Sequence, residues 1–154
     1  MNPFKNYLQE GIADVLSDVL DRLASHQKNH KKMIQWAKYE SHRSIALYGF
    51  AHTLKEANAH CLIPIQSELN SLHDVARRYN DQLFSAAWND VAEKLNELTV
   101  DLRKIESAVG KVRNDRDLSH LLTEWGVWGV DYQDLVEAYA EAVGDFEEQI
   151  QELF

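Results

Sequence analysis

The chain has 154 residues, of which 45% are hydrophobic and 27% are charged. This length suits one domain with its own core, and this composition argues against intrinsic disorder. A lone cysteine, Cys61, cannot form an internal disulfide, which favours a reducing compartment. Because the chain opens without the apolar run of a signal peptide and has no run of ~18 apolar residues, we expect a cytoplasmic protein with no membrane segment.

The net charge of −9 is unevenly distributed along the chain. All 16 Lys and Arg lie within residues 1–116, whereas residues 117–154 contain ten Asp and Glu and no Lys or Arg. A surface of that charge attracts basic proteins and repels nucleic acid. We therefore expect a protein partner with a basic surface and no direct nucleic-acid binding.

The spacing of apolar residues predicts an all-α protein. Between residues 4 and 62, apolar side chains recur at alternating intervals of four and three, and the polar stretch 25–32 weakens the pattern. This stretch contains a helix-disfavouring Asn, so it is the expected break. The pattern predicts helices over residues 4–26 and 30–62, with one continuous helix as the alternative.

A second helical pattern follows Pro64. Proline disfavours helix in the preceding residue and suits the first turn of a new helix, so residues 61–65 are expected to form a turn. The spacing then predicts one helix over 65–112, with a run of consecutive fours after Leu83 interpreted as a coiled-coil stutter. Antiparallel pairing of this helix with 30–62 would bring Trp36 and Trp88 to the same level.

The end of the chain is predicted to form a helix over 117–125, a break at the glycines of residues 126–129, and a last helix over 132–154. The predicted architecture is an elongated antiparallel helical bundle, or coiled-coil hairpin, with a C-terminal acidic helix. A long apolar stripe also makes a homodimer possible.

The acidic last helix is the predicted partner-binding site. Like charges four residues apart, such as Glu137 and Glu141, each lower helix stability by a few tenths of a kcal/mol, so stability alone does not explain them. Such surfaces are typical of bacterial immunity proteins and phage anti-defence proteins that inhibit nucleic-acid-processing enzymes. The sequence thus favours a non-enzymatic binding or inhibitory protein, with these candidate residues: Asp134, Glu137, Glu141, Asp145, Glu148 and, as an aromatic anchor, Trp128.

An enzymatic alternative comes from residues 113–120, which read Arg-Asn-Asp-Arg-Asp-Leu-Ser-His. This segment resembles the Arg-polar-(x)n-His signature of the HEPN ribonucleases, which are small helical bundles that dimerise over the motif. The resemblance implies RNA cleavage, with Arg113 and the polar Asn114 at the site and His120 transferring a proton. An Arg and a His at such a spacing also arise by chance, so this interpretation stays second.

Two weaker alternatives concern a metal and a membrane. His52, Glu56 and His60 follow one another at intervals of four, and the predicted hairpin would bring His73 level with them, as a metal site needs. Solvated histidines are the favoured interpretation, and we predict no cofactor. Long helices joined at residues 61–65 also resemble BAR-type membrane-bending dimers, but the basic concave face that this resemblance implies does not suit a net acidic chain.

Overall fold

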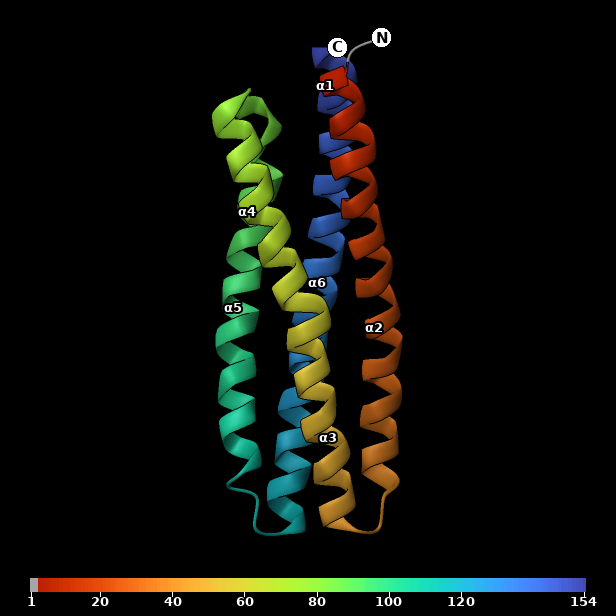
Figure 1. Cartoon of the computed structure of the whole chain (residues 1–154). Helices are drawn as coiled ribbons and strands as arrows, with labels where there is room; N and C mark the ends of the chain where they lie inside the picture. The colour runs from red at the N-terminus through yellow and green to blue at the C-terminus, as the bar shows by residue number, and fades with distance from the viewer. Residues whose placement is uncertain (1–2) are drawn as a thin grey trace.

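A computed structural model describes residues 3–154, which form four long helical rods of alternating direction (Figure 1). These residues contain no strand, so the predicted all-α antiparallel bundle is confirmed. In chain order the elements are α1 (Pro3–Asn6), the π-helix η1 (Tyr7–Ala13), α2 (Asp14–Tyr39), α3 (Arg43–Ala57), the π-helix η2 (Asn58–Leu62), α4 (Ile63–Arg78), the 3-10 helix η3 (Asp81–Leu83), α5 (Ala86–Val109) and α6 (Asp115–Leu153).

The rods occupy the four corners of the bundle. The last rod, α6, packs along α5 on one side and along α2 on the other, while α3 and α4 belong to the rod diagonal to it. Both ends of the chain lie at the upper end of the view in Figure 1, and the connections 40–42 and 110–114 lie at the lower end.

The first rod runs through the polar stretch 25–32 without a break, so the boundary predicted between helices 4–26 and 30–62 is wrong. The side chains of His26 and His30 are buried on the core face of α2. Packing of this face against α6 outweighs the weak intrinsic helix preference of the polar residues.

A three-residue connection, 40–42, ends the first rod instead. Glu40 and His42 both have extended backbone, and the carboxylate of Glu40 accepts a hydrogen bond from the backbone N–H of His42 at 3.2 Å. The alternative of one continuous helix through residue 62 is therefore also wrong.

The second rod, from Arg43 to Arg78, passes through Pro64, so the turn predicted at 61–65 is wrong. In a regular α-helix the proline ring collides with the carbonyl four residues earlier, and proline offers no N–H. Here η2 precedes it, and the N–H of Ile63 donates to the carbonyl of Asn58, five residues earlier. The wider π-helical turn accommodates the ring.

The chain reverses direction at residues 79–85, so the single helix predicted over 65–112 is wrong. The side chain of Asn80 accepts a backbone N–H within this loop at 2.9 Å, and Leu83 is buried in the core. Because Leu83 packs inward from the loop itself, the apolar spacing continues across the turn and hides it. The run of fours between Leu83 and Leu95 marks this reversal and is not a stutter.

The hairpin predicted about residues 61–65 does not form, and Trp36 and Trp88 have different surroundings. Trp36 is 41% exposed and lies beside Gly49 of α3, whereas Trp88 is fully buried and packs edge-to-face on Tyr139 of α6, with ring centroids 5.6 Å apart. The turn on which the BAR resemblance depended is absent as well.

The last rod is one helix, so the predicted separation into 117–125 and 132–154 is wrong. No residue of the 126–129 segment leaves the helix. At Gly129 a Cβ would overlap the imidazole of His30, so this glycine serves close packing and not helix termination.

The core runs the length of the bundle. The apolar spacing of the last helix predicts seven inward residues. Five of them are buried, namely Leu135, Tyr139, Val143, Phe146 and Ile150, whereas Val136 and Leu153 are half-buried. Within residues 3–154, none of the helices combines the length and the apolar character that a membrane span requires.

Candidate interaction surface

The acids of the upper half of α6 form a row along its outer face. Asp134, Glu137, Glu141 and Glu148 are exposed, and Asp145 is half-buried. We call these five residues the acidic row. After Arg116, α6 contains no Lys or Arg, so neutralising charge must come from elsewhere.

The base that acts on the row is Lys94 of α5. A hydrogen bond from its ammonium group to Asp90 is the main cause of the raised pKa of Lys94, and Asp134 contributes more weakly. Because Lys94 is already paired with Asp90 at 3.2 Å, it neutralises the lower end of the acidic row only in part.

The fold places the positive and negative charges of the sequence at different levels along the bundle axis. Two hydrogen bonds define the middle level: Trp128 Nε1 donates to the carbonyl of Leu98 at 3.0 Å, and the Tyr132 hydroxyl donates to the carbonyl of Leu23 at 2.7 Å. In the second rod Cys61 lies beside Tyr132, which places residue 57 at the level of Trp128. Below this level, residues 28–57 and 98–127 contain 11 Lys and Arg against seven Asp and Glu, a net charge of +4.

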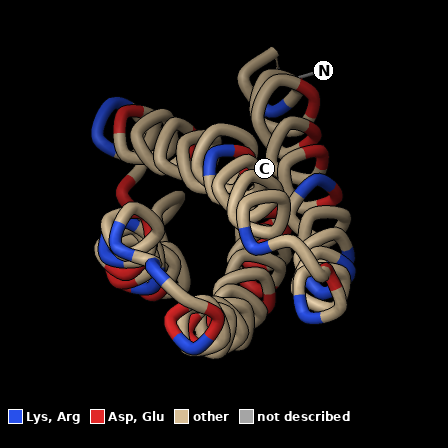
Figure 2. The backbone as a smooth tube through the Cα atoms, turned by 90° about the horizontal axis from the view of Figure 1, so that it is seen from below, with Lys and Arg blue, Asp and Glu red and all other residues tan. Residues whose placement is uncertain are grey.

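The remaining charged residues lie in the upper half of the bundle, which has five Lys and Arg against 18 Asp and Glu, a net charge of −13. The view from below in Figure 2 shows blue segments gathered at the near ends of the rods. The bundle therefore offers a basic end and an acidic end, a property that the linear sequence did not reveal.

The aromatic anchor predicted at Trp128 is wrong, because the side chain is only 2% exposed. Its indole stacks between Trp125 and Tyr132, at centroid distances of 4.7 and 5.3 Å, and its N–H is satisfied by the Leu98 carbonyl. The residue belongs to the core because α6 continues straight through residues 126–129.

Two histidines of α2 face this aromatic stack. His30 lies 4.5 Å from Trp125 and His26 lies 5.6 Å from Tyr132, measured between ring centroids. The Nε2 atom of His26 and both ring nitrogens of His30 make no well-formed hydrogen bond. Burial is the main cause that lowers the pKa of His30 to about 4, with His26 acting in the same direction and the Trp125 backbone opposing it.

The pKa of His26 is lowered as well, again chiefly by burial. Glu56 opposes this shift and His60 adds to it. Close by, burial raises the pKa of the Cys61 thiol to about 11, which keeps it protonated and unreactive. The polar core therefore consists of neutral groups. The signal was available in the sequence, since His26 and His30 fall on the apolar spacing of the first helix.

The residues of the ribonuclease alternative lie at the lower end of the bundle. The Asn114 side chain accepts the backbone N–H of Asp117 at 2.8 Å, so it caps α6, and the backbone N–H of Arg113 donates to the Asp117 carboxylate at 3.0 Å. His120 is exposed and its Nε2 lies 3.3 Å from a carboxylate oxygen of Glu124. The capping role accounts for Asn114, and RNA cleavage stays a prediction.

The histidines of the metal alternative do not meet as a ligand set. Nε2 of His52 lies 3.0 Å from the Glu56 carboxylate at the surface, His60 is exposed, and His73 stacks on Phe84 at 3.7 Å. Within residues 3–154, no group of three or more His, Cys, Asp or Glu is arranged to hold a metal ion. Because the second rod continues through Pro64, His73 lies farther up the same rod and not opposite His52.

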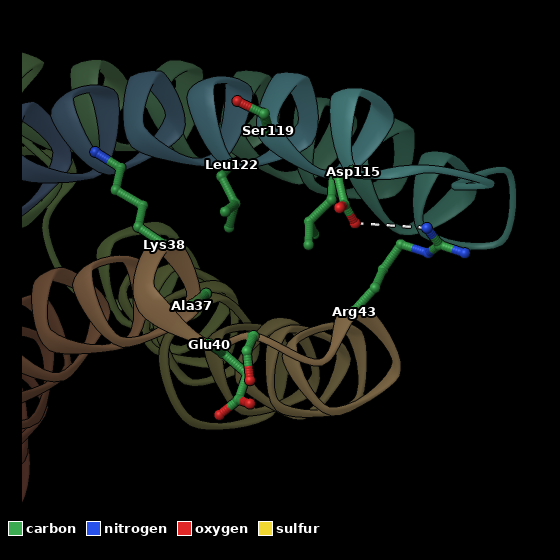
Figure 3. Close-up of a pocket in the computed structure, with 9 residues that line it drawn as sticks. Ala37, Lys38, Glu40, Arg43, Asp115, Ser119 and Leu122 are labelled. Carbon is green, nitrogen blue, oxygen red and sulfur yellow. Dashed lines mark hydrogen bonds and ion pairs between the residues drawn. The ribbon is translucent and has the colours of Figure 1, made fainter.

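The pocket drawn in Figure 3 lies at the lower end, between the 40–42 connection and the start of α6. Its volume is about 320 Å³. Arg43 and Asp115 face each other across it, with an exposed ion pair of 3.5 Å. Ser41 lines the pocket, and its hydroxyl lies 3.2 Å from Nδ1 of the exposed His42, which in turn lies 3.5 Å from the Glu40 carboxylate.

No protein-family model matches the chain, and comparisons with curated proteins and with solved structures found no match either.

Proposed function

We propose that this protein is a non-enzymatic helical interaction protein whose acidic row binds the basic surface of a partner protein, such as a nucleic-acid-processing enzyme. The observation that carries the proposal is the outer face of α6 above Trp128, where acids are exposed in succession and no Lys or Arg stands among them.

Two acids elsewhere in the bundle are paired with bases on the same helix. Asp74 lies 3.0 Å from Arg77 and 3.3 Å from Arg78, and Asp90 lies 3.2 Å from Lys94. The upper half of α6 contains no such pairs, and its like charges at intervals of four lower the stability of the helix. Net negative charge also favours solubility, but acids placed four residues apart on one helix add a cost in helix stability that solubility does not require. A basic partner would compensate the repulsion.

The spacing of these charges suits a nucleic-acid-binding groove. Eight acids lie between Asp131 and Glu152, and at 1.5 Å per residue they span ~32 Å, about one charge per 4 Å. One strand of B-DNA presents about one phosphate per 3.4 Å. A groove built to bind a phosphate backbone therefore fits the charge density of this helix.

The test compares two variants of equal net charge. The first changes four members of the row, Glu137→Gln, Glu141→Gln, Asp145→Asn and Glu148→Gln. The control changes four acids of α5: Glu93→Gln, Glu97→Gln, Asp101→Asn and Glu106→Gln. Proteins captured by the immobilised wild type are identified by mass spectrometry, and the dissociation constant of the captured partner is then measured with all three proteins.

We expect the row variant to bind at least about 10-fold more weakly at low salt, and the control to bind like wild type. Wild-type affinity should also fall steeply as salt rises through the physiological range. If a folded row variant binds its partner as tightly as wild type at low salt, the proposal is wrong. Equal weakening by both variants would mean that only net charge matters.

A further inference from the structure

The ridge of the first rod that faces away from the core carries two blocks of opposite charge. The upper block is acidic and the lower block is basic, and all eight side chains are exposed: Glu10, Asp14, Asp18, Asp21, then Lys28, Lys31, Lys32 and Lys38. Between the blocks lie the small, exposed residues Ala24 and Ser25. In Figure 2 the rod that leads to the N-terminus has blue segments towards its near end and mostly red segments, with some blue, farther away.

Five of these side chains share one side of the helix, namely Asp14, Asp18, Asp21, Lys28 and Lys32, whereas Lys31 and Lys38 lie about a quarter of a turn or more away from them. With 3.6 residues per turn, Asp14, Asp18 and Asp21 lie opposite the buried row that contains Leu16 and Leu23. Lys28 and Lys32 continue the same line two and three turns farther down. The ridge therefore presents a single stripe whose sign changes once, at its centre.

Nothing in the described part of the chain neutralises this stripe. The ion pairs within residues 3–154 involve none of the eight residues. Like charges stand four apart at Asp14 and Asp18 and again at Lys28 and Lys32, an arrangement that lowers helix stability. The helix dipole can account for Asp14 and Lys38, which lie in the first and last turns of α2, but not for the charges between them, because its effect is confined to the terminal turns.

We propose that a second copy of this chain docks on the ridge in antiparallel orientation, about a two-fold axis beside Ala24 and Ser25. In this arrangement Asp21 faces Lys28 of the second copy, and Asp18 faces Lys32 of the second copy. Two-fold symmetry makes each of these contacts twice, which is the property of a self-complementary interface.

The ridge determines the orientation of the second copy. A parallel copy would place acid against acid and lysine against lysine, whereas an antiparallel copy opposes every block with its complement. Small side chains at the crossing point let the two helices approach closely. At the ends, Tyr39, which is 83% exposed, lies beside Glu10 and Tyr7 of the second copy and adds apolar contact to the ion pairs.

This dimer is independent of the proposed function. The α2 ridge and the acidic row of α6 belong to adjacent corners of the bundle and face different sides. Each copy therefore keeps its acidic row free, and the dimer would present two rows to a partner. If the dimer does not form, the proposed binding of a basic partner is unaffected. If no basic partner binds the acidic row, the proposed dimer is unaffected.

The test reverses each block in a separate variant of the full chain. One variant carries Asp14→Lys, Asp18→Lys and Asp21→Lys, and the other carries Lys28→Glu, Lys31→Glu and Lys32→Glu. Sedimentation equilibrium at about 50 mM salt should show wild-type dimers and, for each variant alone, a dissociation constant raised at least about 30-fold. An equimolar mixture should form a heterodimer, because one ridge is then wholly basic and the other wholly acidic.

The matched control reverses Glu93, Glu97 and Glu106 of α5 to Lys and should dimerise like wild type. A second readout uses Ser25→Cys, which should cross-link to itself under mild oxidation, whereas Ser67→Cys on α4 should not; the native Cys61 is buried. Three outcomes would each overturn the proposal: the wild type is monomeric at low salt, both folded reversal variants still dimerise, or their mixture stays monomeric.

Discussion

The neighbouring helices α2 and α6 both place polar side chains in the core, but they satisfy them differently. On α6, Trp128 and Tyr132 donate hydrogen bonds to backbone carbonyls, as does Tyr139, whose hydroxyl lies 3.2 Å from the carbonyl of Leu16. On α2, His26 and His30 have buried ring nitrogens without a well-formed hydrogen bond, and on α6 the buried Nε1 of Trp125 also has no partner. The hydrogen-bonded groups of α6 stabilise the fold at any moderate pH, whereas the two histidines of α2 are tolerated only while they are neutral.

The outer faces of the same two helices differ as well. The acids of α2 are followed by lysines on one stripe, whereas the acids of α6 continue to its end without a base. A stripe with both signs can complement itself, and a stripe with one sign needs a different molecule. Two adjacent helices therefore suggest two kinds of partner.

The largest expected effect is a loss of folding stability in mild acid. An unfolded histidine has a pKa near 6.5, whereas that of His30 in the fold is about 4. The contribution of the neutral His30 ring to stability is fully present above pH 6.5. It is lost as the pH falls towards 4, which lowers the free energy of unfolding by about 3 kcal/mol. Urea unfolding between pH 7.5 and 4.5 measures it. His30→Leu should flatten the slope relative to wild type, and the exposed control His52→Leu should not; equal slopes in all three would contradict the prediction.

The next effect contrasts two glycines of α6. A methyl group at Gly129 overlaps the buried His30 ring, whereas one at Gly126 meets nothing within 4 Å. We expect Gly129→Ala to lower the free energy of unfolding by about 1–3 kcal/mol. Gly126→Ala should raise it by up to ~1 kcal/mol through better helix propensity. Thermal or urea unfolding of the pair is the measurement, and equal effects would show that His30 does not pack closely on α6.

The smallest effect concerns the tyrosine hydroxyls that join α6 to α2. Tyr132→Phe should cost about 1 kcal/mol, and Tyr139→Phe less, because the bond from Tyr132 is 2.7 Å long and that from Tyr139 is 3.2 Å. Tyr48→Phe, at a side chain that is 80% exposed, is the control and should leave stability unchanged. If neither core variant loses stability, the satisfied groups of α6 contribute no more than the unsatisfied ones of α2.

Much of this bundle follows from local pattern. The three- and four-residue spacing predicted helices and the faces they bury, and in α6 it identified both the inward row from Leu135 to Ile150 and the acids outside it. These features depend on the helical period and on the low free energy of apolar side chains away from water, which are local properties of a sequence. The acidic row was predicted on the same basis. The aromatic anchor at Trp128 was predicted wrongly, because its burial depends on the continuity of α6.

The ends of the helices were decided by tertiary structure. Leu83 packs into the core from a loop, Pro64 is accommodated by a π-helical turn, and Gly129 receives the ring of His30 from another rod. Leu83 and Gly129 take their roles from partners distant in the sequence, whereas Pro64 is accommodated by the turn directly before it. The sequence alone determined which faces are apolar and where the charge lies along the chain. Packing between rods decided where the chain turns, and therefore which charges lie close together in space. The reason is that contact free energies between helices exceed the few tenths of a kcal/mol by which local preferences differ.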